Sequence, residues 1–297
     1  MVYLRSQQSI RLALSIAFLV LTTSIVIGSE PARLTTDGTM KFSPVFFPGE
    51  NAVVYCLHEE PTRVALWKLN LTDGTKSRLY EPESSHQFDA AFSSDGRYHC
   101  FCRSSTSRQL VLIIKDTESL TETEFQPPGE LRSTIRTPSF TRDDSRILFT
   151  LSAPGGLQIA SVDIHGKDLK HLTQSAGANY WPSLSPDGRQ IVFSSSRGGN
   201  LDLYVMSSEG GDAKQLTNTK SRNIRPAWSP DGKRIAFTSA RDGNYEVYAI
   251  ESDGSNLVRV TEHPERDDYA RWSPTGDFLL TVSERNGEFD LYRWDIP

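Results

Sequence analysis

The sequence repeats one pattern of short apolar runs and turns about every 44 residues. The stretch "LSPDGRQIVFSSSRGGNLDLYVM" starts at Leu184, and "WSPDGKRIAFTSARDGNYEVYAI" starts 44 residues later at Trp228. Six copies align on the large apolar residue at this position, which is Phe46, Phe92, Phe140, Leu184, Trp228 and Trp272 in turn. A repeat period of about 20 to 50 residues is typical of solenoids and propellers. The copies fill the chain after residue 28, so we expect one domain over residues 29–297.

Each copy is predicted to form four short β-strands. In the copy around Trp228, the turn "SPDG" follows the first strand, and "RIAF", "YEVYAI" and "LVRVT" are the next three. These runs are rich in Val, Ile, Tyr, Phe and Thr, which favours strands over helices. In the turn, Pro sets φ, Asp binds its own backbone and Gly takes a left-handed conformation. We therefore assign a structural role to the turn residues Asp187, Gly188, Asp231 and Gly232.

A single four-stranded sheet with two apolar faces cannot bury both of them. Six such sheets arranged radially around an axis cover one another, which is the arrangement of a β-propeller. The sequence therefore predicts an all-β fold, a six-bladed β-propeller. The six aligned apolar residues are expected to pack between the blades.

The two ends of the repeat array complement each other. The last copy ends with "EFDLYRWDIP", after its third strand, whereas "ARLTTDG" near residue 34 has the "LT" sequence that the other copies place in their fourth strand. We predict that Leu34 pairs beside the strand that contains Leu291 and Tyr292. This pairing would complete the last blade with the N-terminal strand and cover an exposed sheet edge.

Residues 1–28 differ in composition from the rest of the chain. Arg5 and Arg11 are followed by the apolar run "LALSIAFLVLTTSIVIG", which ends in small residues. These are the parts of a secretory signal peptide, and cleavage is expected after Gly28. The alternative is a short membrane anchor, because 17 residues approach the length of about 20 that spans a bilayer. Both interpretations place the propeller outside the cytoplasm, either periplasmic or secreted, or held at the membrane.

Charge and cysteine content exclude two further classes of protein. The net charge is −5, and it becomes more negative without residues 1–28, which hold two arginines and no acid. An acidic chain without a basic cluster is a poor ligand for nucleic acid. The odd number of cysteines predicts no disulfide framework. We expect Cys56, Cys100 and Cys102 to be buried free thiols.

The repeat resembles the WD40-like (PD40) repeat of TolB-type periplasmic propellers. The string "PAWSPDGKRIAFTSARDGNYEVYAI" and its equivalent before it carry the resemblance, which is specific over residues 182–261 and extends over about 33–297. The resemblance implies a six-bladed propeller that is exported and acts by binding protein partners in the cell envelope, as in the Tol–Pal system. TolB proteins also carry an α/β domain before the propeller, for which this chain has no room.

No catalytic signature is found in the sequence. It contains no G-x-S-x-G nucleophile elbow, P-loop or dinucleotide-binding fingerprint, and its six histidines have no ligand-like spacing. Arg197, Arg241 and Arg285 recur after the second strand and are expected to brace that loop. We therefore expect a protein that is not an enzyme and that has no cofactor and no metal site.

The candidate binding residues lie next to the loops that vary most between the copies. These loops precede the first strand of each copy, and function usually resides in variable loops on a rigid scaffold. If alternate residues of the first strands face the channel, a set of polar and aromatic side chains converges near its mouth: Asp89, Trp181, Arg225, Tyr269 and Arg271. Aromatic rings and arginines suit an acidic peptide segment or a glycan.

Two classes of function follow. The first is an exported interaction scaffold that binds an envelope protein or peptide segment. The alternative is a glycan-binding or glycan-cleaving propeller that uses the central channel. Clustered histidines or carboxylates in the channel would favour the second, and a stable protein partner would favour the first.

Overall fold

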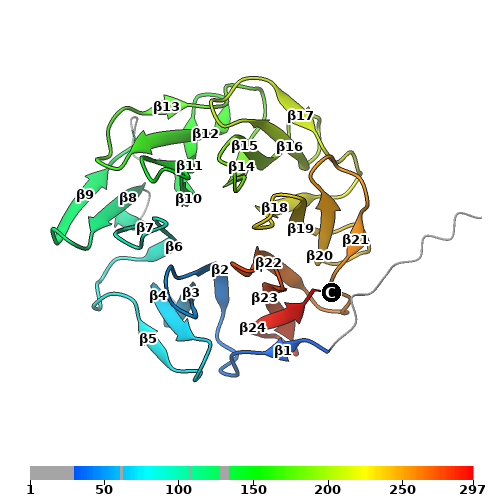
Figure 1. Ribbon diagram of the computed structural model, residues 1–297, viewed down its shortest axis with the longest axis horizontal. Helices are drawn as coiled ribbons and strands as arrows, with labels where there is room; N and C mark the ends of the chain where they lie inside the picture. The colour runs from blue at the N-terminus through cyan, green and yellow to red at the C-terminus, as the bar shows by residue number, and fades with distance from the viewer. Residues whose placement is uncertain (1–29, 61–62, 107–108, 128–133, 297) are drawn as a thin grey trace, which may run out of the picture.

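Strands form wherever the sequence alternates short apolar runs with turns, and no other regular element is found. The computed structural model describes residues 30–60, 63–106, 109–127 and 134–296. All regular elements within these ranges are β-strands. The strands form six four-stranded sheets around a central axis (Figure 1). The prediction of a six-bladed β-propeller is confirmed.

Every blade is an antiparallel sheet, and in blades 1 to 5 the order of strands from the centre outward follows the chain. Blades 1 and 2 contain β2 (Lys41–Phe46), β3 (Ala52–Glu60), β4 (Arg63–Asn70) and β5 (Lys76–Arg78), then β6 (Gln87–Phe92), β7 (Tyr98–Thr106), β8 (Gln109–Asp116) and β9 (Thr121–Phe125). Blades 3 and 4 contain β10 (Ile135–Phe140), β11 (Arg146–Ala153), β12 (Gly156–Asp163) and β13 (Lys170–His171), then β14 (Asn179–Leu184), β15 (Gln190–Ser195), β16 (Asp202–Ser207) and β17 (Ala213–Gln215). Blades 5 and 6 contain β18 (Asn223–Trp228), β19 (Arg234–Ser239), β20 (Glu246–Glu251) and β21 (Val258–Arg259), then β22 (Asp267–Trp272), β23 (Phe278–Arg285), β24 (Glu288–Asp295) and β1 (Ala32–Arg33).

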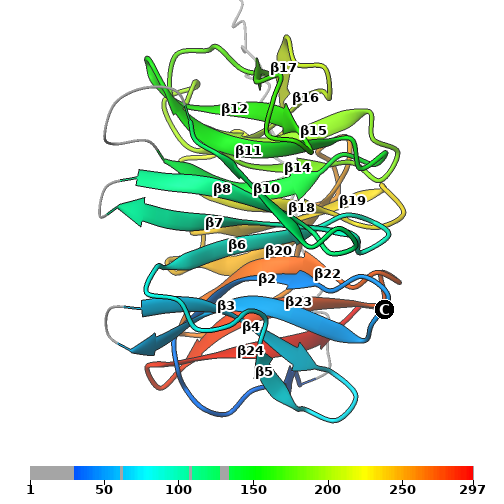
Figure 2. The ribbon, with the colours of Figure 1, turned by 90° about the vertical axis from the view of Figure 1, so that its left-hand side faces the viewer.

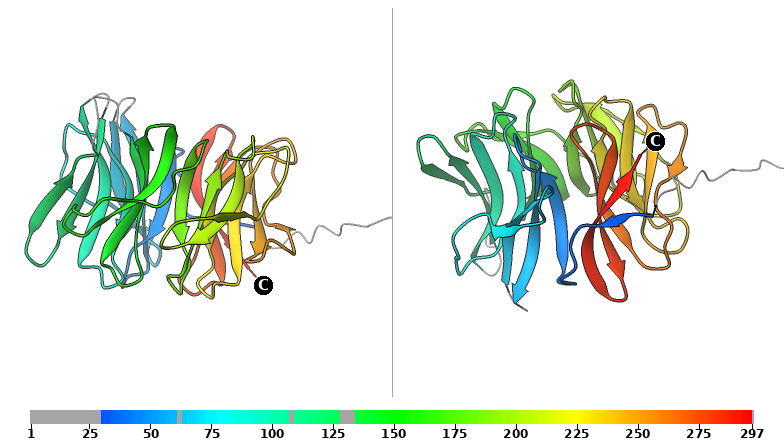
Figure 3. Two further views of the ribbon diagram at one scale, coloured as in Figure 1. Left: turned by 90° about the horizontal axis from the view of Figure 1, so that it is seen from above. Right: turned by 60° about the horizontal axis from the view of Figure 1, so that its bottom comes forward.

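The strands run between two opposite faces of the ring, where the turns and loops gather (Figures 2 and 3). The turns between the first and second strands lie at one end of the channel, which we call the turn rim. The loops that precede the first strands lie at the other end, which we call the loop rim. Both ends are defined by the direction of the innermost strands.

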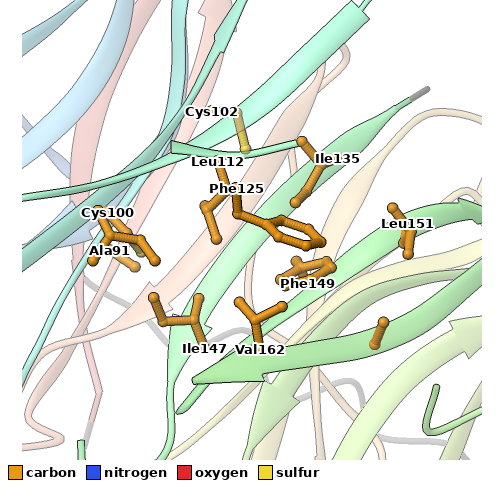
Figure 4. Packing of buried hydrophobic residues seen from close by; sticks show 12 residues of the cluster. Ala91, Cys100, Cys102, Leu112, Phe125, Ile135, Ile147, Phe149, Leu151 and Val162 are labelled. Atoms are coloured by element: carbon orange, nitrogen blue, oxygen red, sulfur yellow. The ribbon is translucent and has the colours of Figure 1, made fainter. Parts of the chain in front are cut away.

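The hydrophobic core lies between the blades. The second and third strands are buried on both faces because a neighbouring blade covers each, which explains their nearly continuous apolar sequences. Between blades 2 and 3, Cys102 and Leu112 pack with Ile147, Phe149 and Val162 (Figure 4). Each of the six aligned apolar residues packs in a cluster that includes residues of the preceding blade; Phe46, for example, contacts the cluster of Leu280 and Leu291.

The N-terminal strand closes the ring. β1 pairs with β24, with Arg33 opposite Tyr292, and the backbone N–H of Leu34 donates to the carbonyl of Leu291 at 2.8 Å (Figure 3, right). The Thr35 hydroxyl donates to Asp290 Oδ1 at 2.5 Å and accepts the Leu291 N–H at 3.0 Å. The predicted closure of the last blade by the first strand is confirmed.

The side-chain bond in this closure is the one that blades 3 to 5 use. The hydroxyl of the threonine in each "LT" segment donates to a side-chain oxygen near the start of the third strand of the same blade. Thr173 donates to Gln158 at 2.7 Å, and Thr217 donates to Asp202 at 2.8 Å. Thr35 therefore completes blade 6 in the manner of an ordinary fourth strand.

The three cysteines are buried free thiols, as expected. Burial raises the pKa of each thiol, with the nearby charge of Asp89 acting in the same direction on Cys56 and Cys102. Residues 1–28, assigned above to a signal peptide or short anchor, lie outside the described residues. Within the described ranges there is no helix long and apolar enough to cross a membrane.

Candidate binding site in the central channel

Each innermost strand contains a bulge at its third residue. The pairing with the second strand shifts register there, and the residue has a left-handed φ between 49° and 57°. We call these residues the bulge positions: Ser43, Asp89, Thr137, Trp181, Arg225 and Tyr269. A left-handed conformation is uncommon for residues other than glycine and costs about 1–3 kcal/mol. A bulge redirects a side chain, so this repeated strain sets how the channel is lined.

The bulge positions lie inside the first strands, two residues after the start of each. Proline follows four of the six bulge positions, at Pro44, Pro138, Pro182 and Pro226. Because proline lacks an N–H donor, it is tolerated within a sheet mainly at edges and bulges. The repeated proline was therefore the signal in the sequence that marks the bulge.

The channel contains a cavity of about 630 Å³. Residues of all six innermost strands line it, together with residues of the turns that follow three of them, such as Ser94, Arg142 and Pro186. None of its lining residues belongs to the described loops at the loop rim. The cavity therefore extends from the level of the bulges to the turn rim, whereas the sequence analysis expected the candidate residues near the mouth beside the variable loops.

Trp181, Arg225 and Tyr269 come together at the level of the bulges. The guanidinium carbon of Arg225 lies 4.9 Å from the centre of the Trp181 ring and 4.1 Å from that of Tyr269. Arg225 also donates to Asp268 Oδ2 at 2.9 Å and to the Tyr269 hydroxyl at 3.2 Å. Of these three bulge residues, Trp181 is a lining residue of the cavity. The ion pair with Asp268 neutralises the charge of Arg225 within the protein.

Asp89 is also paired within the protein. Its Oδ2 accepts Arg136 Nε at 2.5 Å and the Thr137 N–H at 3.0 Å. Burial acts to raise the pKa of this carboxyl, but the charge and hydrogen bonds of Arg136 outweigh it and hold the pKa below the usual range. Asp89 therefore lines the cavity as a carboxylate that already has a cation.

Arg271 differs from the other candidate residues because it has no acidic partner. Among the described residues, its guanidinium forms one hydrogen bond, from Nη1 to the Ala270 carbonyl at 3.4 Å, and no ion pair. Arg271 lines the cavity, where burial lowers the pKa of its guanidinium while the charge of Asp89 acts in the opposite direction. Ser139 Oγ and Trp272 Nε1 belong to the same lining and are buried without a hydrogen-bond partner.

The repeated polar residues serve the blades. Asp187 Oδ1 accepts the Ser185 hydroxyl at 2.6 Å and the Arg189 N–H at 3.0 Å, while Gly188 has φ +76°. The equivalent Asp231 accepts the Ser229 hydroxyl, also at 2.6 Å, and is followed by Gly232.

The repeated arginines link strands within one blade. Arg197 and Arg241 each donate at 3.0 Å to the asparagine that begins the first strand of their blade, which is Asn179 or Asn223. Each guanidinium also lies over an aromatic ring of the third strand, at 4.9 Å from Tyr204 for Arg197. Arg285 makes the equivalent bond to Asp267 at 2.9 Å.

Sequence reasoning missed the residues that neutralise the candidate site. Arg136 and Asp268 each precede a bulge position, and each pairs with a bulge residue of a neighbouring blade, Asp89 or Arg225. The only local signal was a charge placed next to the bulge. No group of three or more His, Cys, Asp or Glu side chains in the described part of the chain is arranged to hold a metal ion.

The comparisons with known proteins agree with this geometry. The family model of the TolB beta propeller domain matches residues 53–219 and 129–297. No curated protein matches the sequence.

Three solved structures show the same fold. TolB from Acinetobacter baumannii has 23% identity and a TM-score of 0.65, covering 84% of this chain and 65% of its own. A structure from Agrobacterium tumefaciens, assigned as TolB, has 22% identity and a TM-score of 0.64, covering 75% and 81%. Oligogalacturonate lyase from Vibrio parahaemolyticus has 13% identity and a TM-score of 0.59, covering 89% and 93%. With the family model matching nearly all of the propeller, this chain belongs to the TolB beta-propeller family.

Proposed function

We propose that this protein is an exported interaction scaffold of the cell envelope that binds a peptide segment of a partner protein in its central channel. The observation that carries the proposal is the 630 Å³ cavity, which is lined by all six blades and holds Trp181 and an arginine without an acidic partner. An aromatic ring and a guanidinium are common anchors for protein ligands. Membership of the TolB beta-propeller family supports the same role.

Glycan cleavage has less support from the chemistry of the cavity. Glycosidic cleavage by hydrolysis needs a carboxylic acid with a raised pKa beside a second carboxylate. The carboxylates that line the cavity are Asp89 and Asp144. Asp89 is held ionised by Arg136, and Asp144 accepts the N–H of Ser94 at 2.9 Å. The likeness to oligogalacturonate lyase, at 13% identity, concerns the fold alone.

The experiment is a cross-linked pull-down from envelope extracts with the full chain as bait. We expect wild-type protein to capture a defined partner and Trp181→Ala to lose most of it, because Trp181 lines the cavity. Arg189→Ala is the control, since Arg189 is an exposed residue of the turn rim and lies outside the cavity lining. Equal capture by Trp181→Ala and wild type would remove the channel from the proposal, and failure of wild type to capture any partner would overturn the scaffold role.

Export is tested separately on the N-terminus. Because residues 1–28 have the parts of a secretory signal, we expect the protein recovered from the periplasm or medium to begin at Ser29. Intact-mass measurement of this material checks the cleavage. A mass that includes residues 1–28 in a membrane fraction would support the anchor instead.

A further inference from the structure

One level of the channel combines small side chains with a single long cation. Two residues after the bulge positions, the six innermost strands carry the set that we call the inner ring: Val45, Ala91, Ser139, Ser183, Ala227 and Arg271. All six line the cavity. Five of these side chains are short, so the space at this level of the channel is left to Arg271 and to whatever binds there.

Among the described residues, Arg271 is the partly buried cation of this cavity that has no ion pair. Arg142 also lines the cavity without an ion pair, but it is exposed and donates to the Pro186 carbonyl. Arg136 is paired with Asp89, and both Arg225 and Arg266 are paired with Asp268. Arg271 has no carboxylate within 4.0 Å among the described residues. A partly buried cation without a counter-charge is unfavourable unless a ligand supplies one.

Two further donors belong to residues that line the cavity and have no acceptor in the structure. Ser139 occupies the inner-ring position of blade 3, which lies across the channel from blade 6, where Arg271 is (Figure 1). Its Oγ is buried and unpaired, as is Trp272 Nε1. In blade 5, the equivalent Trp228 Nε1 donates to the Ser183 carbonyl at 3.2 Å, so the free N–H of Trp272 is particular to blade 6. Both atoms are shielded from solvent, so partly exposed Arg271 is the donor of the inner ring that a ligand in the cavity can reach.

A guanidinium without a counter-charge selects an anionic acceptor. The planar guanidinium binds a carboxylate with two parallel hydrogen bonds, which makes the carboxylate the best-matched anion of a peptide. The cavity reaches the turn rim through residues such as Ser94 and Pro186. The turn rim therefore gives a ligand access to Arg271.

We propose that the channel is a carboxylate-binding site, in which a partner peptide entering from the turn rim places one carboxylate on Arg271. This inference rests on the proposed binding function and specifies its ligand. The carboxylate belongs either to an acidic side chain or to a C-terminus, and the two sources share the same chemistry at Arg271.

Small carboxylates test this site without knowledge of the partner. The full chain is titrated with N-acetylglutamate α-amide, which carries a side-chain carboxylate, and with N-acetylglycine, which carries a terminal one. Tryptophan fluorescence is the readout, because Trp181 and Trp272 line the cavity. We expect saturable binding of at least one of them, weakened about tenfold or more in Arg271→Ala, and no binding of N-acetylglutamine amide. Whichever carboxylate binds more tightly identifies the source.

Controls separate this inference from the scaffold role and from misfolding. Arg189→Ala removes an exposed arginine of the same rim and should bind as wild type does. Arg271→Lys keeps the charge without the planar fork and should bind with intermediate affinity, and circular dichroism checks that both Arg271 variants are folded. Unchanged binding in Arg271→Ala, or no saturable carboxylate binding in wild type, overturns the carboxylate site even if the pull-down captures a partner. Equal or tighter binding of inorganic phosphate or glucuronate would also overturn it, because the site would then not select a peptide carboxylate.

Discussion

Blades 5 and 6 meet at a pair of buried carboxyl groups. In the two preceding seams, the asparagine that begins a first strand donates from Nδ2 to the third strand of the blade before it, at 2.8 Å in the pairs Asn179–Gln158 and Asn223–Asp202. Forty-four residues after Asn223, the chain has Asp267, and forty-four residues after Asp202 it has Glu246. Both side chains are fully buried, and Asp267 Oδ2 has no hydrogen-bond partner.

This pair makes the stability of the ring depend on pH. Burial and the charge of Glu246 raise the pKa of Asp267 from 3.8 to about 6, against the opposing effects of Ser283 and Arg285. The folded state therefore binds this proton more tightly than the unfolded state does. The stability contributed by this bound proton is fully present below pH 3.8 and is lost as the pH rises through 6. The difference between the folded and unfolded pKa values corresponds to about 3 kcal/mol.

The variant Asp267→Asn removes this dependence. An asparagine cannot ionise, and its Nδ2 can donate to Glu246 as Asn223 does to Asp202. Arg285 keeps an acceptor, because Arg241 already binds Asn223 in the equivalent place at 3.0 Å. We expect the free energy of unfolding to be close to that of wild type near pH 4 and higher by up to about 3 kcal/mol above pH 7.

The assay is urea unfolding of wild type and Asp267→Asn between pH 4 and 8, followed by circular dichroism. The matched control is Asn223→Asp, which places a carboxylate opposite Asp202 and should be destabilised more at pH 8 than at pH 5. Parallel pH profiles for wild type and Asp267→Asn, or a less stable Asp267→Asn at pH 8, would refute the reasoning.

Three further results are expected. Deleting residues 30–36 should sharply lower the melting temperature, since it removes β1 and the Thr35 bond to Asp290; an unchanged melting curve would contradict ring closure. Phe149→Ala should reduce the free energy of unfolding by about 3–5 kcal/mol in chemical denaturation, because the ring is fully buried between blades 2 and 3; a loss below 1 kcal/mol would contradict that packing. The three cysteines should react with a thiol reagent only after unfolding, because burial hides them and raises their pKa; rapid reaction of the native protein would show that they are accessible.

The fold could be predicted from the sequence because its determinants are local and repeated. Each turn, strand and apolar anchor recurs in the copies, so the period alone implies the number of blades, and the unmatched "LT" segment implies the closure. The bulge positions were singled out by comparing copies, but their place within the strand depends on register with β-strands that follow several residues later. Register is a property of pairing and is not visible in one strand.

The pairing of charges in the channel could not be predicted in the same way. Asp89 and Arg136 are 47 residues apart, and Arg225 and Asp268 are 43 apart, so each pair forms only when neighbouring blades meet. The sequence grouped Asp89, Arg225 and Arg271 as equivalent charged residues. The structure distinguishes Arg271, which forms no ion pair, from the other two, whose partners lie in neighbouring blades.

The shared sixth blade has a consequence for how the protein folds. Its fourth strand comes from residues 32–33 and its other three from residues 267–295, so the blade joins segments at opposite ends of the propeller sequence. Joining segments so far apart carries a large loop-closure entropy, which the five sequentially built blades reduce by bringing the ends close together. Blade 6 should therefore assemble last, and a nascent chain released before its C-terminal strands emerge would expose the apolar faces of blades 1 and 5 and an unpaired β1, all prone to associate with other chains.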